Sequence, residues 1–236
     1  MFIPPGGGYS RGMREHVSTS ATNDVDLRAD RAFEPGYTGV DHEGEPGYDG
    51  RLLRGERTKL QIAEAMIDLI EEGNPKPTAR LIAERAGVSL RLVFHHFEDI
   101  EAVFHEAAMI QAGRHWRKVV TIPPTGPVAA RIEATARQRR QLYVAISPIR
   151  QVAAVRAVDD ENIQKLMAAG RRRLRRELAT TFEPELSTAR GDGPILLDSV
   201  ESVTNWETWH ALRVNDHKSA AAAQRVVQYM LAALLG

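Results

Sequence analysis

Apolar residues recur at steps of three and four residues along the chain from Thr58 onward. This spacing places side chains on one face of an α-helix, whereas a half-buried strand would alternate apolar and polar residues, and no stretch of this chain does so. The first helical pattern continues until Gly73, Pro75 and Pro77 interrupt it. The sequence therefore predicts an all-α fold.

Capping residues mark the next predicted helices. Thr78, Ser89 and Asp99 each precede an apolar pattern and carry the side-chain oxygen that an N-cap needs. Gly87 separates the first two of these helices and is able to adopt the positive φ of a tight turn. The predicted helices cover residues 78–86, 89–97, 99–120, 128–146, 149–157, 159–182, 195–213 and 219–235.

Residues 1–50 lack the helical pattern. They hold nine of the 18 glycines and carry four arginines against nine acidic residues. We expect a disordered, acidic, Gly/Pro-rich tail, although the repeated Glu-Pro-Gly-Tyr at Glu34 and Glu45 has a docking motif as its alternative interpretation. The rest of the chain divides into a small helical domain at 51–100 and a larger one at 101–236.

Composition excludes several classes of protein. The 236 residues include no cysteine, so disulfides, a thiolate nucleophile and a zinc ribbon are absent. The 31 basic and 31 acidic residues balance, which argues against a general polyanion binder. The chain has neither the pattern of a secretory signal nor a membrane-spanning apolar segment, and we expect a cytoplasmic protein. It also lacks a nucleophile constellation, a phosphate-binding glycine loop and a His-Glu-x-x-His pattern, so we expect neither an enzyme nor a cofactor.

Residues 78–97 have the spacing of a helix-turn-helix. Val93 and Phe97, four residues apart, point inward, so the second helix turns Leu90, Arg91, Phe94 and His95 outward. A helix of this width fits the major groove of DNA, where Arg91 is suited to hydrogen-bond guanine and the two apolar residues to contact thymine methyl groups. The alternative is an ordinary helical hairpin in a core.

The run from Arg57 to Phe104 resembles the DNA-binding head of the tetracycline-repressor (TetR/AcrR) family, through Ile82-Ala83-Glu84-Arg85-Ala86-Gly87-Val88-Ser89 and Val93-Phe94-His95-His96-Phe97. The resemblance implies base contacts from Leu90, Arg91, Leu92 and Phe94 and phosphate contacts from Thr78, His95 and His96, and Ser89 is counted with this surface. The sequence departs from the family's usual residues at Leu90-Arg91-Leu92 and at Ile100, so the operator sequence does not follow from the resemblance.

The adjacent histidines have a second interpretation as a metal pair. Neighbouring helix residues lie about 100° apart and no third ligand stands at i+4, so no metal site is predicted. If His95 and His96 contact phosphate, DNA affinity rises as pH falls from 8 to 6, because protonated imidazole binds phosphate better.

The last two predicted helices indicate a homodimer. Specific binding by one small head needs a second head one helical turn away on a near-palindrome. Apolar residues at every third position from Leu197 to Leu212 wind around one helix, and Val226 to Leu235 leave little polar surface on the other. We expect dimerisation through roughly 195–235, with closure of the monomer's own core as the alternative.

The resemblance to the TetR/AcrR family implies that the middle helices enclose a ligand pocket. Arg139 falls on an apolar stripe of the predicted helix 128–146, and a buried arginine needs an anion, either a protein carboxylate or an acidic ligand. The candidate ligand-binding residues are Gln111, His115, Trp116, Arg139, Tyr143 and Arg150.

These observations predict a homodimeric one-component transcription regulator, a repressor that an unknown small-molecule effector releases from double-stranded DNA. The alternatives are a ligand-independent regulator or activator, an all-α enzyme or carrier, and a nucleoid protein that binds DNA without sequence preference. A preference for one short palindrome distinguishes the first class from the last.

Overall fold

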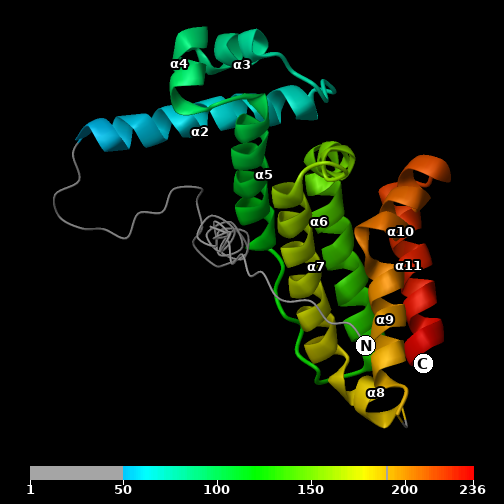
Figure 1. The fold of residues 1–236 in the computed structure, drawn as a ribbon. Helices are drawn as coiled ribbons and strands as arrows, with labels where there is room; N and C mark the ends of the chain where they lie inside the picture. The colour runs from blue at the N-terminus through cyan, green and yellow to red at the C-terminus, as the bar shows by residue number, and fades with distance from the viewer. Residues whose placement is uncertain (1–49, 190) are drawn as a thin grey trace, which may run out of the picture.

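The computed structural model describes residues 50–189 and 191–236, and every regular element in these two ranges is helical. The predicted all-α fold is therefore confirmed. Apart from residue 50, the predicted tail at 1–50 lies outside the described residues. The helices form a small head and a larger body, which α5 joins (Figure 1).

The head consists of α2 (Gly50–Glu71), α3 (Ala79–Ala86) and α4 (Leu90–His96), packed on the upper part of α5 (Ile100–Trp116). All three predicted caps are confirmed, because the side chains of Thr78, Ser89 and Asp99 accept hydrogen bonds from backbone amides in the first turn of the following helix. Gly87 has a φ of 68°, as the tight turn requires. The pattern that predicted α5 to about Val120 overran its end, which is at Trp116.

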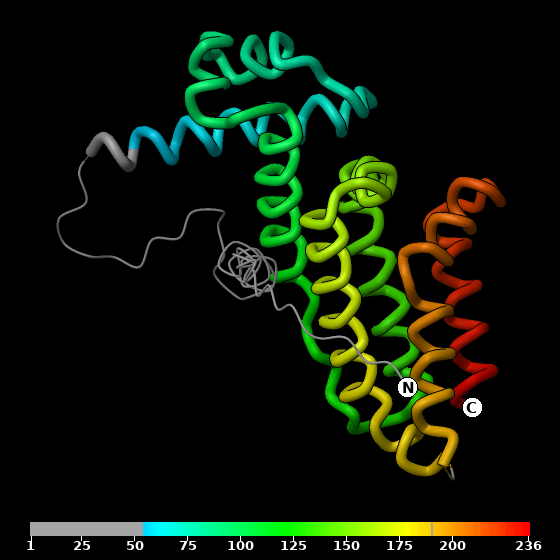
Figure 2. Tube along the Cα trace, viewed as in Figure 1, coloured from blue at the N-terminus to red at the C-terminus, as the bar shows by residue number. Residues whose placement is uncertain are grey.

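The long helices of the body are α6, α7 and α11, and shorter elements lie beside them (Figures 1 and 2). Helix α11 packs along α6, and α9 packs against both α7 and α11. The elements are α6 (Val128–Arg156), α7 (Glu161–Thr181), α8 (Glu183–Thr188), α9 (Gly193–Thr204), α10 (Trp206–His210), the π-helical turn η1 (Ala211–Asn215) and α11 (Ala220–Leu235). Within the described ranges, no helix has both the length and the apolar character needed to cross a bilayer.

The prediction of two helices at 128–146 and 149–157 was wrong, because α6 continues through Pro148. Proline lacks an amide hydrogen, which removes one helical hydrogen bond. Packing maintains the helix on both sides of this position, where Tyr143 and Ile149 are buried. The hydroxyl of Ser147 also donates to the carbonyl oxygen of Tyr143 at 2.6 Å.

The single helix predicted at 195–213 was also wrong, because the chain breaks at Asn205. This residue has an extended backbone, and its side-chain oxygen accepts a hydrogen bond from the Thr208 amide at 2.7 Å, so it caps a new helix. The π-helical turn follows directly. The short α8, with Pro184 in its first turn, was not predicted.

Candidate nucleic-acid interface and interior cavity

Helix α4 presents one face to solvent at the end of the molecule farthest from the body (Figure 1). Leu90 and Phe94 are 44% and 49% exposed, although both are large and apolar, and Arg91 and His95 are exposed beside them. Val93 is completely buried on the opposite face. The four residues that the sequence predicted to face outward are therefore all exposed on α4.

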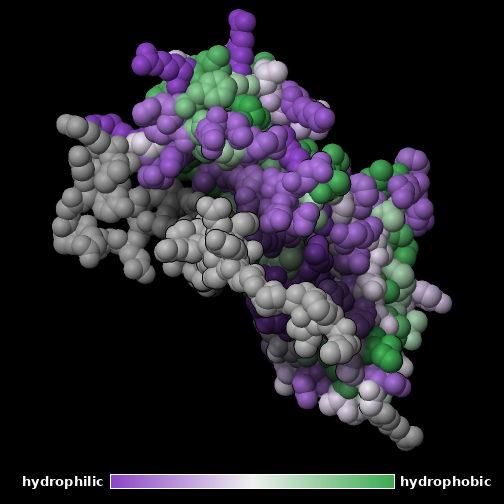
Figure 3. Space-filling view, viewed as in Figure 1, coloured by the Kyte–Doolittle hydropathy of each residue, from purple (hydrophilic) through white to green (hydrophobic). Residues whose placement is uncertain are grey.

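Arg91 is free to contact a partner molecule, because it forms no ion pair with any residue in the described ranges. Arg85 in α3 differs, since its guanidinium donates to both carboxylate oxygens of Glu72 at 2.9 and 2.6 Å. That hydrogen-bonded pair lowers the pKa of the Glu72 carboxyl group. Figure 3 shows polar residues gathered around the head, with apolar residues between them.

The remaining predicted contact residues flank this surface. Thr78 and Ser89 are exposed, and their hydroxyl oxygens accept bonds from the Leu81 and Leu92 amides at 3.3 and 3.2 Å. Each hydroxyl hydrogen is left to donate to an acceptor such as a phosphate oxygen. Leu92 is half-buried and presents only part of its side chain.

The two histidines lie edge to face, with 5.2 Å between their ring centroids. His95 is exposed, whereas His96 is half-buried. Loss of hydration lowers the pKa of His96, and the nearby His95 and Lys59 add to this effect. The described residues contain no group of three potential metal ligands, so the pair has no third protein ligand there.

A cavity of about 100 Å³, partly open to solvent, reaches into the interior of the body among α5, α6, α7 and the junction of α9 with α10. Four of the predicted ligand-binding residues line it, namely Gln111, Trp116, Tyr143 and Arg150. His115 and Arg139 do not. Most of the other lining residues are apolar, including Ala108, Ala112, Ile146, Ile149, Ala153, Leu166, Met167, Leu174 and Leu178.

Arg139 lies in a separate polar cluster within the core. It is 2% exposed and donates to the Glu177 carboxylate, which also accepts hydrogen bonds from Gln138 and Thr181. Of the two anions considered for Arg139, the structure therefore provides the protein carboxylate. The neighbouring Arg131 also pairs with a protein carboxylate, since it donates to Glu185 at 2.7 and 2.5 Å.

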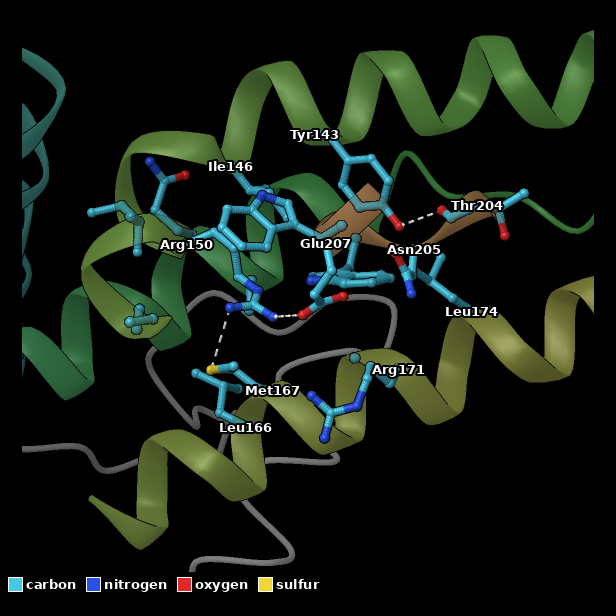
Figure 4. A pocket seen from close by; sticks show the side chains of 18 of the residues that line it. Tyr143, Ile146, Arg150, Leu166, Met167, Arg171, Leu174, Thr204, Asn205 and Glu207 are labelled. Atoms are coloured by element: carbon cyan, nitrogen blue, oxygen red, sulfur yellow. Dashed lines mark hydrogen bonds and ion pairs between the residues drawn. The ribbon is translucent and has the colours of Figure 1, made fainter. Parts of the chain in front are cut away.

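Two cavity residues hold the broken helix in place (Figure 4). The Tyr143 hydroxyl donates to the carbonyl oxygen of Thr204 at 2.9 Å, and thereby pairs a carbonyl at the end of α9. Burial raises the pKa of Tyr143, so this hydroxyl keeps its proton. Arg150 donates to Glu207 at 2.9 Å and approaches the sulfur of Met167 at 3.6 Å. Its guanidinium lies 4.4 Å from the ring centroid of Trp206.

Three cavity residues, Asn205, Trp206 and Glu207, were missed in the sequence analysis because the segment from 195 to 213 was interpreted as one helix. Arg171 of α7 also lines the cavity, and it was missed because the arginine run from 171 to 176 was expected to be solvated. The sequence contained a signal for the break, since an asparagine followed by an acidic residue in the next turn is typical of a helix start.

Hydrogen bonds connect the cavity helices to the head. The amide of Gln111, a cavity residue, donates to Glu71 at the end of α2 over 2.7 Å. Farther along the junction, Arg156 donates to Glu101 at 2.6 Å, and His105 lies 2.5 Å from Asp160. The position of α5 against the body is therefore coupled to the position of the head.

Comparisons with known proteins give one family model and two solved structures that are similar to this chain. Residues 62–107 match the family model for bacterial regulatory proteins of the tetR family. No curated protein matches the chain. A transcriptional regulator from Rhodococcus sp. Rha1 has a similar structure, with 17% sequence identity and a TM-score of 0.61 over 75% of this chain and 95% of that one. A TetR-family regulator from Mesorhizobium loti MAFF303099 is 19% identical, with a TM-score of 0.48 over 77% of this chain and 96% of that one.

Proposed function

Since residues 62–107 match the family model for bacterial regulatory proteins of the tetR family, we propose that the chain is a regulator of this family that represses transcription by binding a near-palindromic operator as a homodimer until a small molecule releases it. In this proposal residues 51–100 bind DNA and residues 101–236 bind the effector and the second subunit. The observation that carries it is the exposed face of α4, where the unpaired Arg91 lies between the exposed side chains of Leu90 and Phe94.

The contacts divide into two kinds. Leu90, Arg91, Leu92 and Phe94 would contact base edges, and Arg91 is the hydrogen-bond donor for guanine. Thr78, Ser89, His95 and His96 would hold phosphates and position the helix, because phosphate contacts carry no direct sequence information.

The dimer surface in this proposal lies on α9 and α11. Val227, Leu231 and Leu235 of α11 are buried in the subunit's own core, while Tyr229 of the same helix is 79% exposed. Apolar residues follow the α11 edge of the body in Figure 3. Two subunits joined there would present two α4 helices to successive major grooves, about 34–36 Å apart.

Release would follow from a difference in affinity. An effector shifts the protein only if it binds the form with weak DNA affinity more tightly than the other form. The hydrogen bond from Gln111 to Glu71 provides a direct connection between the cavity and the head. Effector binding would move α5 and change the separation of the two heads.

Footprinting on the intergenic DNA beside the protein's own gene tests the DNA-binding part. We expect a protected near-palindrome, and Arg91→Ala should weaken operator binding by about tenfold to a hundredfold while relaxing the preference at one base pair. Arg176→Ala is the matched control, because Arg176 is exposed on α7. Equal binding of operator and random DNA by the unmodified protein would refute the proposal.

A further inference from the structure

We infer that the interior cavity selects a small, mainly apolar carboxylate, which binds the Arg150 guanidinium in place of Glu207. The inference gives the chemical class of the effector in the proposed function. It rests on that proposed function only because it calls the ligand an effector.

The size of the cavity limits the ligand. Pockets for drug-sized molecules measure about 300–1,000 Å³, whereas this cavity measures about 100 Å³. An apolar cavity of about 150 Å³ accommodates benzene. The ligand is therefore a short-chain compound, and the aliphatic lining from α5, α6 and α7 favours a hydrocarbon body.

Arg150 is the cation that this cavity leaves incompletely paired. Its side chain is only 13% exposed, yet among the described residues it donates to one carboxylate oxygen and makes one weak contact with a thioether sulfur (Figure 4). Loss of hydration lowers the pKa of Arg150, and the like charge of Arg171 adds to that effect. A second acceptor would therefore stabilise this guanidinium more than it would stabilise an exposed arginine.

The partner that Arg150 has is replaceable. Glu207 is 54% exposed, so its carboxylate is able to turn into water and remain hydrated. Ion pairs with an exposed partner contribute little to stability, because water competes for both charges. A ligand carboxylate at the same position would bind Arg150 through two parallel hydrogen bonds, which one oxygen of Glu207 does not provide.

The charged residues that line the cavity favour a ligand with a single negative charge. Glu201 is already held by Arg175, which also pairs with Asp198. Arg150 and Arg171 then face only Glu207 among the remaining charged lining residues. A cationic ligand would meet this positive excess, and a monoanion neutralises it.

One unpaired donor in the lining suits a polar group of the ligand. The indole nitrogen of Trp206 has no hydrogen-bond partner among the described residues, and this residue is more than nine-tenths buried along the lining. Buried polar atoms without partners are uncommon in proteins. The indole is a donor suited to a carboxylate oxygen.

Butanoate and its neutral isostere butanamide test the inference, with the full-length protein titrated by calorimetry and by tryptophan fluorescence, since Trp116 and Trp206 line the cavity. We expect butanoate to bind about tenfold or more tightly than butanamide, as a charge-assisted pair replaces a neutral contact. Equal affinity of the two probes, or no binding of either, would overturn the inferred ligand class.

Three variants identify the group that selects the charge. Arg150→Gln should abolish the preference for butanoate, Arg150→Lys should retain part of it, and Glu207→Gln should strengthen butanoate binding because the competing carboxylate is gone. Arg137→Gln is the control, since Arg137 lies on the same helix, is half exposed and pairs with Glu133. A butanoate preference that survives in Arg150→Gln contradicts the inference.

Operator binding without any probe is measured on the same preparations. Intact operator binding combined with no butanoate preference refutes the ligand class alone. Loss of operator binding by the unmodified protein refutes the proposed function, whatever the result with butanoate.

Discussion

The interior of the body contains a buried ion pair whose two partners come from different helices. Arg139 of α6 and Glu177 of α7 are 2% and 5% exposed, and they hold these two helices together below the cavity. Periodicity along one helix predicts that Arg139 is buried, but the partner is 38 residues away, and only the packing of α6 on α7 identifies it. The sequence therefore predicts that Arg139 needs an anion but does not identify Glu177 as that anion.

Arg139→Met leaves the Glu177 carboxylate buried without its cation. We expect the free energy of unfolding to fall by about 3–5 kcal/mol, because an unpaired buried charge is strongly destabilising. Urea denaturation at a fixed protein concentration measures the loss. The double variant Arg139→Met/Glu177→Leu should recover most of it, and a double variant as unstable as the single one would contradict this explanation.

His96 gives a pH dependence with a defined direction. Its pKa is lowered from the ordinary value of 6.5, so the ring is neutral at pH 7 and gains its charge only in more acidic solution. Protonated imidazole binds phosphate better, so the contribution of His96 to DNA affinity should still be increasing as the pH falls past 6.5. The sequence alone placed the increase anywhere between pH 8 and 6.

Operator affinity measured from pH 8 to 5.5 at constant salt tests this direction. His96→Gln should remove the increase on the acidic side while leaving affinity at pH 8 nearly unchanged. An increase in the unmodified protein that is complete by pH 7 would exclude His96 as its source.

At the scale of elements, local signals predicted the head well. Thr78, Ser89 and Asp99 are N-caps and Gly87 ends α3, because these roles depend on the residue and its immediate neighbours. The body was predicted less well. Pro148 is tolerated inside α6 because packing on both sides outweighs one lost hydrogen bond, and such packing is not encoded locally.

The outward face of α11 gives a prediction about assembly. Tyr229 is 79% exposed in the subunit, so a change there should leave the subunit fold intact. If this face joins two subunits, Tyr229→Arg places two charges in an apolar contact and should convert the dimer into a monomer. Light scattering coupled to size-exclusion chromatography measures the mass.

Val155→Arg is the matched control, because Val155 is 69% exposed but lies on α6, next to its last residue, and not on α11. It should remain a dimer. A Tyr229→Arg protein that keeps the mass of the unmodified protein would place the dimer surface elsewhere, and a monomer that still binds a palindrome with full affinity would remove the need for a dimer.

At the scale of the whole molecule, one helix belongs to both the head and the body. Helix α5 begins beneath α4 in the head and ends as a wall of the cavity (Figure 1). The sequence predicted this helix but not its contacts, since the bond between Gln111 and Glu71 joins residues 40 positions apart. A ligand that contacts Gln111 would therefore act on α2 through this hydrogen bond, which lies beside a second bond between the two helices, from Arg114 to Glu64 at 2.8 Å.

Glu71→Ala removes this bond from the side of the head and leaves the cavity lining unchanged. We expect butanoate affinity and ligand-free operator affinity to stay close to those of the unmodified protein, whereas the weakening of operator binding by butanoate should become smaller. Reciprocity requires that operator DNA then weakens butanoate binding less by the same factor. Both effects are measurable on one preparation, by gel shift with ligand and by calorimetry with operator.

Glu72→Ala is the control that distinguishes a loss of coupling between the cavity and the head from a general disturbance of the C-terminal end of α2. Glu72 is the adjacent residue and is also exposed, but its carboxylate binds Arg85 within the head instead of α5. If coupling passes through Gln111, this variant keeps the full response to butanoate because the contact from α5 to Glu71 is intact. Equal responses in the two variants would show that the connection between cavity and head runs through other contacts, of which the ion pair of Arg156 with Glu101 would be the next to replace.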